Sequence, residues 1–422
     1  MDINNLLKGV SCACGRLHTC DIEYVYIESG AIRYLSDICA NYKNILVVAD
    51  ENTFAAAGAA TIEALVGKCI QKVIFSGAEI LVPNETAIAK VTEHLENMDL
   101  IIGIGSGVIQ DLCKYVSFYN QVPYMVVATA PSMDGYASNG AAMITDGMKV
   151  TYPAGLPKAI LADTQVLANA PMDMIKSGFG DIIGKFSALN DWKLSRLING
   201  EYFCDYIYDL TYEQIRTTLN LADGILKREE KSIHALMEAL VVIGILMSFA
   251  GSSRPASGSE HHLSHFFEIT GILEGKEYFS HGIDVAYSTI ITAKLREKLL
   301  QKPFPEKIYR PDKQEYTAKM EAIYQSSAKG CMDLQEKVGC YKNNSAQMYL
   351  SKEAEIRQIL AEMPSAAEIE KMLSYVELDS KAFYALYGEE KINNAIWYAK
   401  DLKDRYTVLW LYYDFFGGDG NV

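Results

Sequence analysis

The first 165 residues alternate short apolar runs with helical patterns, and this alternation limits the possible fold more than any other feature. The runs are rich in β-branched residues and are separated by patterns such as Phe54–Leu65 and Glu85–Glu96, whose apolar residues recur at helical spacing. Alternating strands and helices predict a Rossmann-like parallel sheet with helices on both faces. The expected strands are Tyr24–Glu28, Ile45–Ala49, Lys72–Phe75, Leu100–Ile104, Tyr124–Ala128 and Ala159–Ala162. A β-hairpin is expected from Ala141–Ile144 and Lys149–Tyr152, which flank the turn residues Thr145-Asp146-Gly147.

The pattern changes after about residue 165, and from Pro171 onward it is helical almost to the end. We therefore expect an α/β dinucleotide-binding domain at residues 1–168 and an all-helical metal- and substrate-binding domain at 169–422, with the active site in the cleft between them. Helical patterns cover Tyr202–Leu226, Lys231–Phe249, His261–Ile269, Ile283–Leu300, Tyr316–Gln325, Ser345–Met363, Ala366–Val376 and Asn393–Asp414. The apolar run near Ala239–Ala250 is short of the ~20 residues that span a bilayer, so it predicts a buried core helix.

Charge and composition exclude several classes of partner. The formal net charge is −14 and the isoelectric point is about 5.1, whereas nucleic acids and anionic membranes attract basic surfaces. The N-terminal residues lack the pattern of a signal peptide, so a cytoplasmic protein without membrane insertion is expected. Nine scattered cysteines indicate reduced thiols.

One group of cysteines is unusually dense. Cys12, Cys14, His18 and Cys20 stand close enough in sequence to bind zinc, but C-x-C differs from the usual C-x2-C spacing and no second cluster follows. The alternative is a surface turn with small buried thiols.

A glycine-rich turn follows the expected strand Leu100–Ile104 and opens a helix. Glycines let the backbone approach a pyrophosphate closely, and the helix N-terminus offers free N–H groups to it. The turn departs from G-x-G-x-x-G, so a tight turn without a ligand is the alternative. The residues expected to cradle the phosphates are Gly105, Ser106, Gly107, Val108 and Ile109.

Two further segments could contact a nucleotide. Asp50 ends a strand, where a carboxylate can accept hydrogen bonds from a ribose diol, although it could equally cap the following helix. The polar loop from Thr129 to Ser138 also leaves a strand, and its hydroxyls and Asp134 could hold phosphate, ribose or substrate. The alternative for this loop is ordinary turn chemistry.

Histidines are scarce in this chain and concentrate in one region. His261 and His265 are four residues apart and so share one face of a helix, and His281 follows after sixteen residues. Asp181 is an isolated acid in an apolar helical pattern. We hypothesise that Asp181, His261 and His281 hold a divalent metal, because two histidines and one carboxylate leave positions open for a substrate oxygen. Helical histidine pairs can also be purely structural, and His262 points about 100° away from His261, so it is assigned to structure.

These motifs together carry a family resemblance. The segments Gly178–Lys185 (GFGDIIGK), Ser257–His265 (SGSEHHLSH) and Ser280–Gly282 (SHG) resemble the iron-containing alcohol dehydrogenase and dehydroquinate synthase-like superfamily. Within it, Thr129–Ser138 (TAPSMDGYAS) and Ser252–His262 (SSRPASGSEHH) are similar to the sn-glycerol-1-phosphate dehydrogenase family, bacterial branch.

The resemblance implies roles for individual residues. It implies a pyrophosphate cradle at Gly105–Ile109 and contacts to NAD(H) or NADP(H). It also implies metal ligation by Asp181, His261 and His281, with zinc or nickel as the ion and iron as a further candidate. It places His265 at the substrate, in binding or proton transfer. The remaining implied contacts are Thr129, Ser132 and Ser138 to the cofactor and Asp134 and Asp181 to the substrate.

The implied reaction is the reversible reduction of dihydroxyacetone phosphate to sn-glycerol 1-phosphate, by hydride transfer to a metal-polarised carbonyl in a cytoplasmic homodimer. Its anionic substrate needs a cation, and Arg254 is the first candidate because arginine matches phosphate bidentately. Lys185, one helical turn after Asp181, is the second.

Three other functions compete with this interpretation. A glycerol or polyol dehydrogenase would not need the phosphate-binding cation. A dehydroquinate synthase-like lyase usually carries Glu as its metal carboxylate, where this chain has Asp181. An NAD-binding regulator would not need the intact set of Asp181, His261, His265 and His281.

Overall fold

The computed structural model describes residues 3–79, 81–145, 148–308, 311–339 and 345–417. Its residues form two compact units that alternate along the chain: residues 1–179 with 216–252, and 180–215 with 253–422. A single boundary between residues 168 and 169 therefore does not describe these units. Helix α7 (Met172–Asn199) continues from the first unit into the second, and helix α9 (Glu230–Ala250) belongs to the first.

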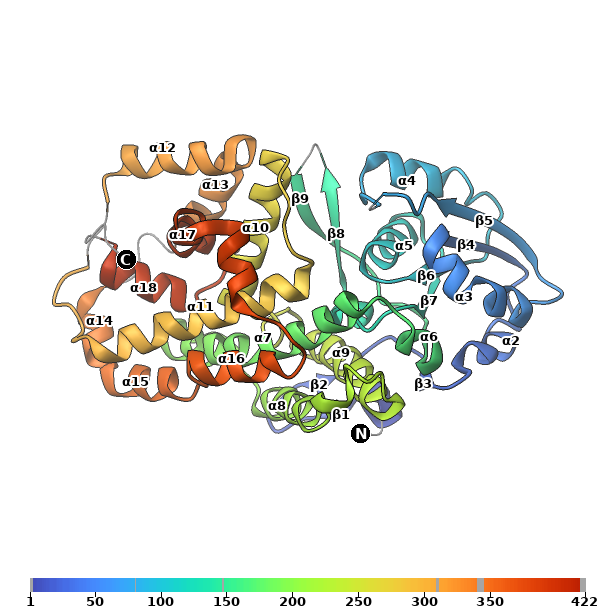
Figure 1. Cartoon of the computed structure of the whole chain (residues 1–422), viewed down its shortest axis with the longest axis horizontal. Coiled ribbons are helices and arrows are strands. Elements are labelled where there is room, and N and C mark those ends of the chain that lie inside the picture. Colours follow the sequence, from blue (N-terminus) through green and yellow to red (C-terminus); the bar gives the residue numbers. More distant parts are fainter. Residues whose placement is uncertain (1–2, 80, 146–147, 309–310, 340–344, 418–422) are drawn as a thin grey trace. The chain divides into compact units, whose positions relative to one another are not determined.

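The first unit is built on a six-stranded parallel sheet of order β3-β10-β7-β6-β4-β5 (Figure 1). All six strands expected from the apolar runs are confirmed. They are β3 (Tyr24–Glu28), β4 (Asn44–Asp50), β5 (Cys69–Phe75), β6 (Leu100–Gly105), β7 (Tyr124–Ala128) and β10 (Ala159–Asp163).

Helices cover both faces of this sheet. Every residue of β6, β7 and β10 is buried, which requires cover on both sides. One face packs Val47, Ile102 and Val127 against helices α2 (Leu35–Ile38) and α3 (Glu51–Ala64). The further helices of this unit are α1 (Ile3–Leu7), α4 (Glu85–Thr92), α5 (Gly107–Asn120) and α6 (Thr164–Ala168).

Two short hairpins complete the first unit. Strands β8 (Gly140–Thr145) and β9 (Met148–Pro153) confirm the predicted hairpin, although its turn residues 146 and 147 lie outside the described part of the chain. Near the N-terminus, β1 (Val10–Ser11) pairs antiparallel with β2 (Leu17–His18), a hairpin that the sequence patterns did not indicate.

Helix α9 is the core helix predicted from the apolar run, but it is longer than that run. Its 21 residues are long and apolar enough to cross a membrane by length and composition, and 83% of its most apolar window is buried inside the protein. Gly244 packs against the backbone of Asp134 at the loop helix η2 (Asp134–Ala137). This burial is characteristic of a core helix.

The second unit is helical, as predicted, in the residues that the structure describes. It combines most of α7 with part of α8 (Asp205–Asn220) and the helices from α10 onward (Figure 1). These are α10 (Ser259–Glu274), α11 (His281–Gln301), α12 (Lys313–Tyr324), α13 (Ala328–Val338), α14 (Ala346–Ser351), α15 (Glu353–Ala361), α16 (Ala366–Ser374), α17 (Ser380–Tyr398) and α18 (Val408–Phe416).

Two of the predicted helices were wrong in their extent. The pattern Ser345–Met363 is interrupted at Lys352, between α14 and α15. The pattern Asn393–Asp414 breaks where α17 ends, and a 3₁₀ turn precedes α18. Neither break carries Gly or Pro in its central residues, so local sequence gave no stop signal.

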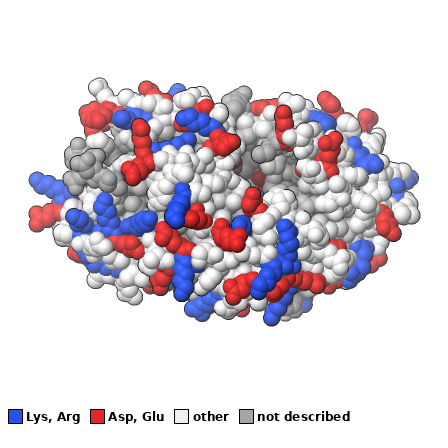
Figure 2. All heavy atoms as spheres, viewed as in Figure 1, with Lys and Arg blue, Asp and Glu red and all other residues white. Residues whose placement is uncertain are grey.

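Buried charges in the second unit connect its helices. Asp191 on α7 accepts from the backbone N–H of Ser259 (2.7 Å) and of Val408 (2.8 Å), the first residues of α10 and α18. Arg296 on α11 donates to the same carboxylate at 2.7 Å. At the surface, acidic and basic side chains are interspersed over the face shown in Figure 2, consistent with the acidic composition.

Candidate metal centre and cofactor-binding turn

The three predicted metal ligands converge in the second unit. Asp181 comes from α7, His261 from α10, and His281 is the first residue of α11. One potential ligand atom from each lies within 4.8 Å of the others. The structure thus brings together residues that are eighty and twenty positions apart in the chain, and two nitrogens with one carboxylate suit a divalent zinc, nickel or iron ion.

Glycines in α7 let these helices approach closely enough for the site to form. A Cβ atom on Gly180 would lie 2.4 Å from the carbonyl oxygen of Gly282, and one on Gly184 would lie 2.4 Å from the Val285 side chain. Real Cβ atoms do not come so close, so α7 and α11 need glycine at both positions. The helix backbone next to Asp181 can therefore lie against the start of α11, which carries His281.

The imidazole of His261 is oriented by a neighbour that the sequence analysis missed. Its Nδ1 lies 2.7 Å from Oε1 of Glu260, so Nδ1 carries the hydrogen and donates to the carboxylate. The other nitrogen, Nε2, lies 3.6 Å from Oδ1 of Asp181. Carboxylates that orient a ligating histidine in this way are typical of metal sites. An acid directly preceding the first histidine was the only signal for Glu260.

Burial is the largest influence on the pKa values of His261 and Glu260. Burial and the charge of Lys185 hold the pKa of His261 well below its usual value, so the ring is neutral, as a metal ligand must be. Burial, then the charge of Asp191, raises the pKa of Glu260 to about 7. Lys185 donates to Asp181 Oδ1 at 2.6 Å and to the carbonyl of Ala256 at 3.0 Å, and both members of this ion pair are fully buried.

His265 lies beside the three predicted ligands and is not part of their converging group. Its ring centroid is 6.2 Å from that of His261 and 5.7 Å from that of His281. It is partly exposed, whereas His262 is fully buried, as expected of a structural residue. The position of His265, one helical turn from His261, suits a residue that contacts a ligand held at the centre.

Arg254 is engaged by the protein itself. Its guanidinium donates to both carboxylate oxygens of Glu201, at 2.7 and 2.5 Å, to Ser195 and to the backbone of Tyr406. The residue is 3% exposed. Its predicted contact with a substrate phosphate stays a prediction, and these bonds favour a structural role.

Two other cations, from the segment between η5 and α18, contact the loop that carries Arg254. Lys403 Nζ donates to Ser257 Oγ at 3.0 Å, and Arg405 donates to the Ser257 carbonyl at 2.9 Å and to Ser253 Oγ at 3.1 Å. The charge of Lys403 is also among those that lower the pKa of His261, so it lies near the metal centre. Sequence analysis missed both residues because they follow His261 by more than 140 positions and belong to no recognised motif.

Three of the residues predicted to contact the cofactor lie at one edge of the sheet in the first unit. Asp50 ends β4, Gly105 ends β6 and Thr129 directly follows β7, and these three strands are neighbours. In parallel sheets, nucleotides bind beyond the carboxyl ends of the strands. The predicted turn is therefore in the expected place.

The turn after β6 is shaped for an anion. Helix α5 begins at Gly107, and its N-cap residue Ser106 makes no side-chain cap, so the first N–H groups are left for another partner. A Cβ on Gly105 would meet the Ile109 side chain at 2.7 Å. These features fit a pyrophosphate at Gly105, Ser106, Gly107, Val108 and Ile109.

The remaining predicted contacts have structural partners as well. Asp50 Oδ1 caps α3 by accepting from Thr53 N–H at 2.9 Å, the alternative that the sequence left open.

Ser138 Oγ donates to the carbonyl of Gly135 and accepts from Lys114. Ser132 lies in the loop packed by Gly178, whose Cβ would fall 1.9 Å from the Pro131 carbonyl oxygen. The nucleotide contacts of Asp50, Thr129, Ser132 and Ser138 stay predictions.

The chain combines a turn suited to a phosphate, on a parallel sheet, with an Asp/His2 group suited to a metal, on helices. Together these features define a class, the metal-dependent dehydrogenases that use a dinucleotide. Comparisons with known proteins agree with it. Residues 26–171 match the family model described as iron-containing alcohol dehydrogenase. A glycerol-1-phosphate dehydrogenase (NAD(P)+) of Halalkalibacterium halodurans is 34% identical over 69% of this chain and 77% of its own. A protein of the same name from Methanosarcina mazei is 35% identical over 57% of this chain and 68% of its own.

Solved structures show the same fold at low sequence identity. An iron-containing alcohol dehydrogenase from Thermococcus thioreducens matches with a TM-score of 0.61 at 12% identity, over 94% of this chain and 99% of its own. A probable glycerol dehydrogenase from Sinorhizobium meliloti matches with a TM-score of 0.54 at 17% identity, over 86% of this chain and 98% of its own.

The chain belongs to the iron-containing alcohol dehydrogenase family, in the branch of the glycerol-1-phosphate dehydrogenases. It is an NAD(P)-dependent oxidoreductase that acts on a CH–OH group with a divalent metal. The carboxylate of Asp181 and the imidazoles of His261 and His281 fit such a metal.

Proposed function

We propose that this protein reduces dihydroxyacetone phosphate reversibly to sn-glycerol 1-phosphate, with NADH or NADPH as the electron donor. The convergence of Asp181, His261 and His281 carries the proposal, because it supplies the open metal site that a carbonyl reduction of this kind needs. The name shared by the relatives supports the phosphorylated substrate.

In the proposed reaction, bound metal supplies a Lewis acid for the C2 carbonyl and bound reduced nicotinamide supplies the hydride. Asp181, His261 and His281 hold the ion, and Glu260 keeps His261 in the tautomer that exposes Nε2. His265 binds the substrate and passes a proton to the oxygen that was the carbonyl. The hydride and this proton together account for the two hydrogens added.

The other residues position the reactants. The turn Gly105–Ile109 binds the pyrophosphate of the cofactor, Asp50 accepts from its ribose, and Thr129, Ser132 and Ser138 contact the rest of it. Asp134 contacts the substrate hydroxyl. We place the substrate phosphate at Lys403 and Arg405, because their cationic groups reach Ser257 beside the metal-binding helix, whereas Arg254 is held by Glu201.

A homodimer in the cytoplasm completes the proposal, and the dimer is checked by light scattering of the purified chain. The function is tested by incubating the metal-loaded protein with dihydroxyacetone phosphate and either NADH or NADPH. We expect oxidation of the cofactor and formation of sn-glycerol 1-phosphate. In the reverse, oxidative direction, we expect kcat/KM to be at least tenfold lower for unphosphorylated glycerol than for sn-glycerol 1-phosphate. If neither cofactor is oxidised, the proposed function is wrong. If glycerol is used as efficiently as sn-glycerol 1-phosphate, the protein is a polyol dehydrogenase instead.

A further inference from the structure

A second cluster of metal-ligating side chains lies in the first unit, in the N-terminal hairpin. Strands β1 and β2 pair with Val10 opposite His18, and the loop between them contains Cys12 and Cys14. The Cys12 N–H donates to the carbonyl of Arg16 at 3.1 Å, which closes the loop. Gly15 adopts φ +84°, a conformation that favours glycine, so the chain turns back directly after Cys14.

The ligand atoms of this hairpin are already close together. One from each of Cys12, Cys14 and His18 lies within 4.8 Å of the others. Nε2 of His18 is 3.5 Å from Sγ of Cys14. Two such ligands on a tetrahedral zinc ion, with ordinary Zn–S and Zn–N bond lengths, would be about 3.6 Å apart. The observed separation therefore matches one edge of a zinc tetrahedron.

The ring of His18 is held in the orientation that a ligand requires. Its Nδ1 lies 3.1 Å from the carbonyl oxygen of Phe249 on α9, and a carbonyl can only accept, so Nδ1 carries the hydrogen. The lone pair is consequently on Nε2, the nitrogen that faces Cys14. The ring also stacks on Phe249 with centroids 5.2 Å apart, and the residue is 1% exposed. In ligating histidines, the ring nitrogen that does not bind the metal frequently donates to a backbone carbonyl, and this hydrogen bond fixes the tautomer.

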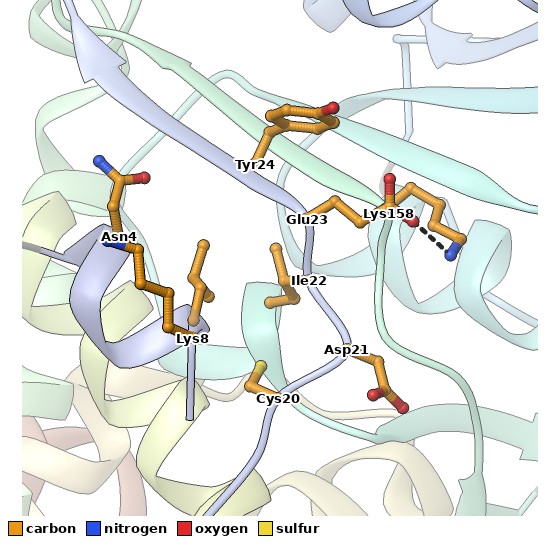
Figure 3. Close-up of a pocket in the computed structure, with 9 residues that line it drawn as sticks. Asn4, Lys8, Cys20, Asp21, Ile22, Glu23, Tyr24 and Lys158 are labelled. Atoms are coloured by element: carbon orange, nitrogen blue, oxygen red, sulfur yellow. Dashed lines mark hydrogen bonds and ion pairs between the residues drawn. The ribbon is translucent and has the colours of Figure 1, made fainter. Parts of the chain in front are cut away.

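Cys20, the fourth member of the cluster in the sequence, is not part of this group. It lines a surface pocket with Asn4, Lys8 and Tyr24 (Figure 3). Burial raises the pKa of its thiol to about 11, so it stays protonated at neutral pH. The structure thus separates three converging residues from a fourth that is only their neighbour in sequence.

We propose that Cys12, Cys14 and His18 bind a structural zinc ion, separate from the ion at Asp181. Two thiolates and an imidazole suit zinc, and the remaining position is taken by a further protein ligand or water. The ion would join the N-terminal hairpin to the C-terminal end of α9 through His18 and Phe249. The proposal does not depend on the reaction catalysed.

The first test counts zinc in the full-length protein after growth with zinc and extensive dialysis. Cys12→Ser and Cys14→Ser are expected to lose one zinc equivalent per chain relative to the wild type. Cys69→Ser is the matched control, since Cys69 is an exposed cysteine on β5 and should leave the zinc content unchanged. Equal zinc in all four proteins would contradict the proposal.

The second test uses cobalt and needs no cysteine variant to fold. Cobalt(II) bound to thiolates gives an intense near-ultraviolet charge-transfer band, and the Asp181 centre contains no sulfur. The wild type loaded with cobalt should show the band, and His261→Ala should keep it while losing the ion at Asp181. The band intensity in single Cys→Ser variants then counts the thiolates. A cobalt-loaded wild type without the band overturns the site, whatever the outcome for dihydroxyacetone phosphate.

Discussion

Gly180 lies so close to Gly282 that a single methyl group between them would clash. A Cβ on Gly180 would be 2.4 Å from the carbonyl oxygen of Gly282 and 2.8 Å from the Cβ of Ala286. Two predicted metal ligands are next to these glycines in the chain, since Asp181 follows Gly180 and His281 precedes Gly282. The distance between Asp181 and His281 therefore depends on how closely α7 and α11 approach.

Gly180→Ala should weaken the metal centre as well as the fold. Overpacking of a buried contact typically costs about 1–3 kcal/mol, and separating the helices also moves Asp181 from His281. We expect the free nickel concentration that restores half of the activity to the chelated protein to rise at least tenfold. Gly330→Ala on α13 is the control, because nothing lies within 4 Å of its Cβ position, and it should leave the nickel requirement unchanged. An unchanged requirement in Gly180→Ala would contradict this interpretation.

Replacing Asp191 should destabilise the helical second unit more than most single substitutions. Its carboxylate pairs with the buried Arg296 and accepts from the first N–H of two helices. Leaving a buried charge unpaired costs roughly 3–5 kcal/mol, so Asp191→Ala should lower the urea midpoint strongly. Glu370→Ala, which removes a partner of an exposed pair with Lys294, should shift it little. Similar midpoints for the two variants would disprove the role of Asp191.

Substitutions of Lys403 and Arg254 should have different effects. The Lys403 variant should bind the substrate more weakly, and the Arg254 variant should be less stable. Lys403→Gln is expected to raise KM for dihydroxyacetone phosphate by about 10–100-fold, the equivalent of one charge-assisted hydrogen bond, with KM for the cofactor unchanged. Arg254→Ala should instead lower the melting temperature, because it leaves Glu201 unpaired. The highly exposed Lys381 provides the control variant Lys381→Gln. A larger KM effect from Arg254 in a protein that is equally stable would restore the original assignment.

Asp50 can be tested without losing its cap on α3. Asparagine caps helices as well as aspartate does but carries no charge, so Asp50→Asn keeps the hydrogen bond to Thr53. If Asp50 faces the ribose, this change should increase kcat/KM for NADPH relative to NADH, since a carboxylate repels a 2′-phosphate. A ratio that stays the same with unchanged stability would leave Asp50 with only its capping role.

Much of the fold could be predicted from periodicity and turn chemistry. The strands were predictable because buried parallel strands are short, apolar and β-branched. The convergence of Asp181, His261 and His281 was predictable because histidines and isolated acids are rare in helical patterns, while their binding of a metal stays a prediction. The split of Asn393–Asp414 into two helices was not predictable: Lys400 and Asp401 form a buried ion pair at the break, and their burial depends on distant aromatic residues such as Trp410 and Tyr316.

The supporting residues of the site were missed for two different reasons. Glu260 directly precedes His261, but the sequence does not show that its carboxylate turns toward the ring and lies 2.7 Å from His261 Nδ1. Lys403 is near the metal centre only because the chain returns to Ser257 after several helices. Conversely, Arg254 looked suited to phosphate by residue type, but type alone could not reveal its bonds to Glu201.

The most direct test of the central claim is the rate of NADH or NADPH oxidation with dihydroxyacetone phosphate after removal of metal by a chelator. The account predicts that the chelated wild type is inactive, that stoichiometric zinc or nickel restores it, and that Asp181→Asn and His281→Ala are not restored at the same metal concentration. A chelated, metal-free wild type that keeps its full rate, or an Asp181→Asn variant restored as well as the wild type, would contradict the claim that Asp181, His261 and His281 hold the catalytic ion.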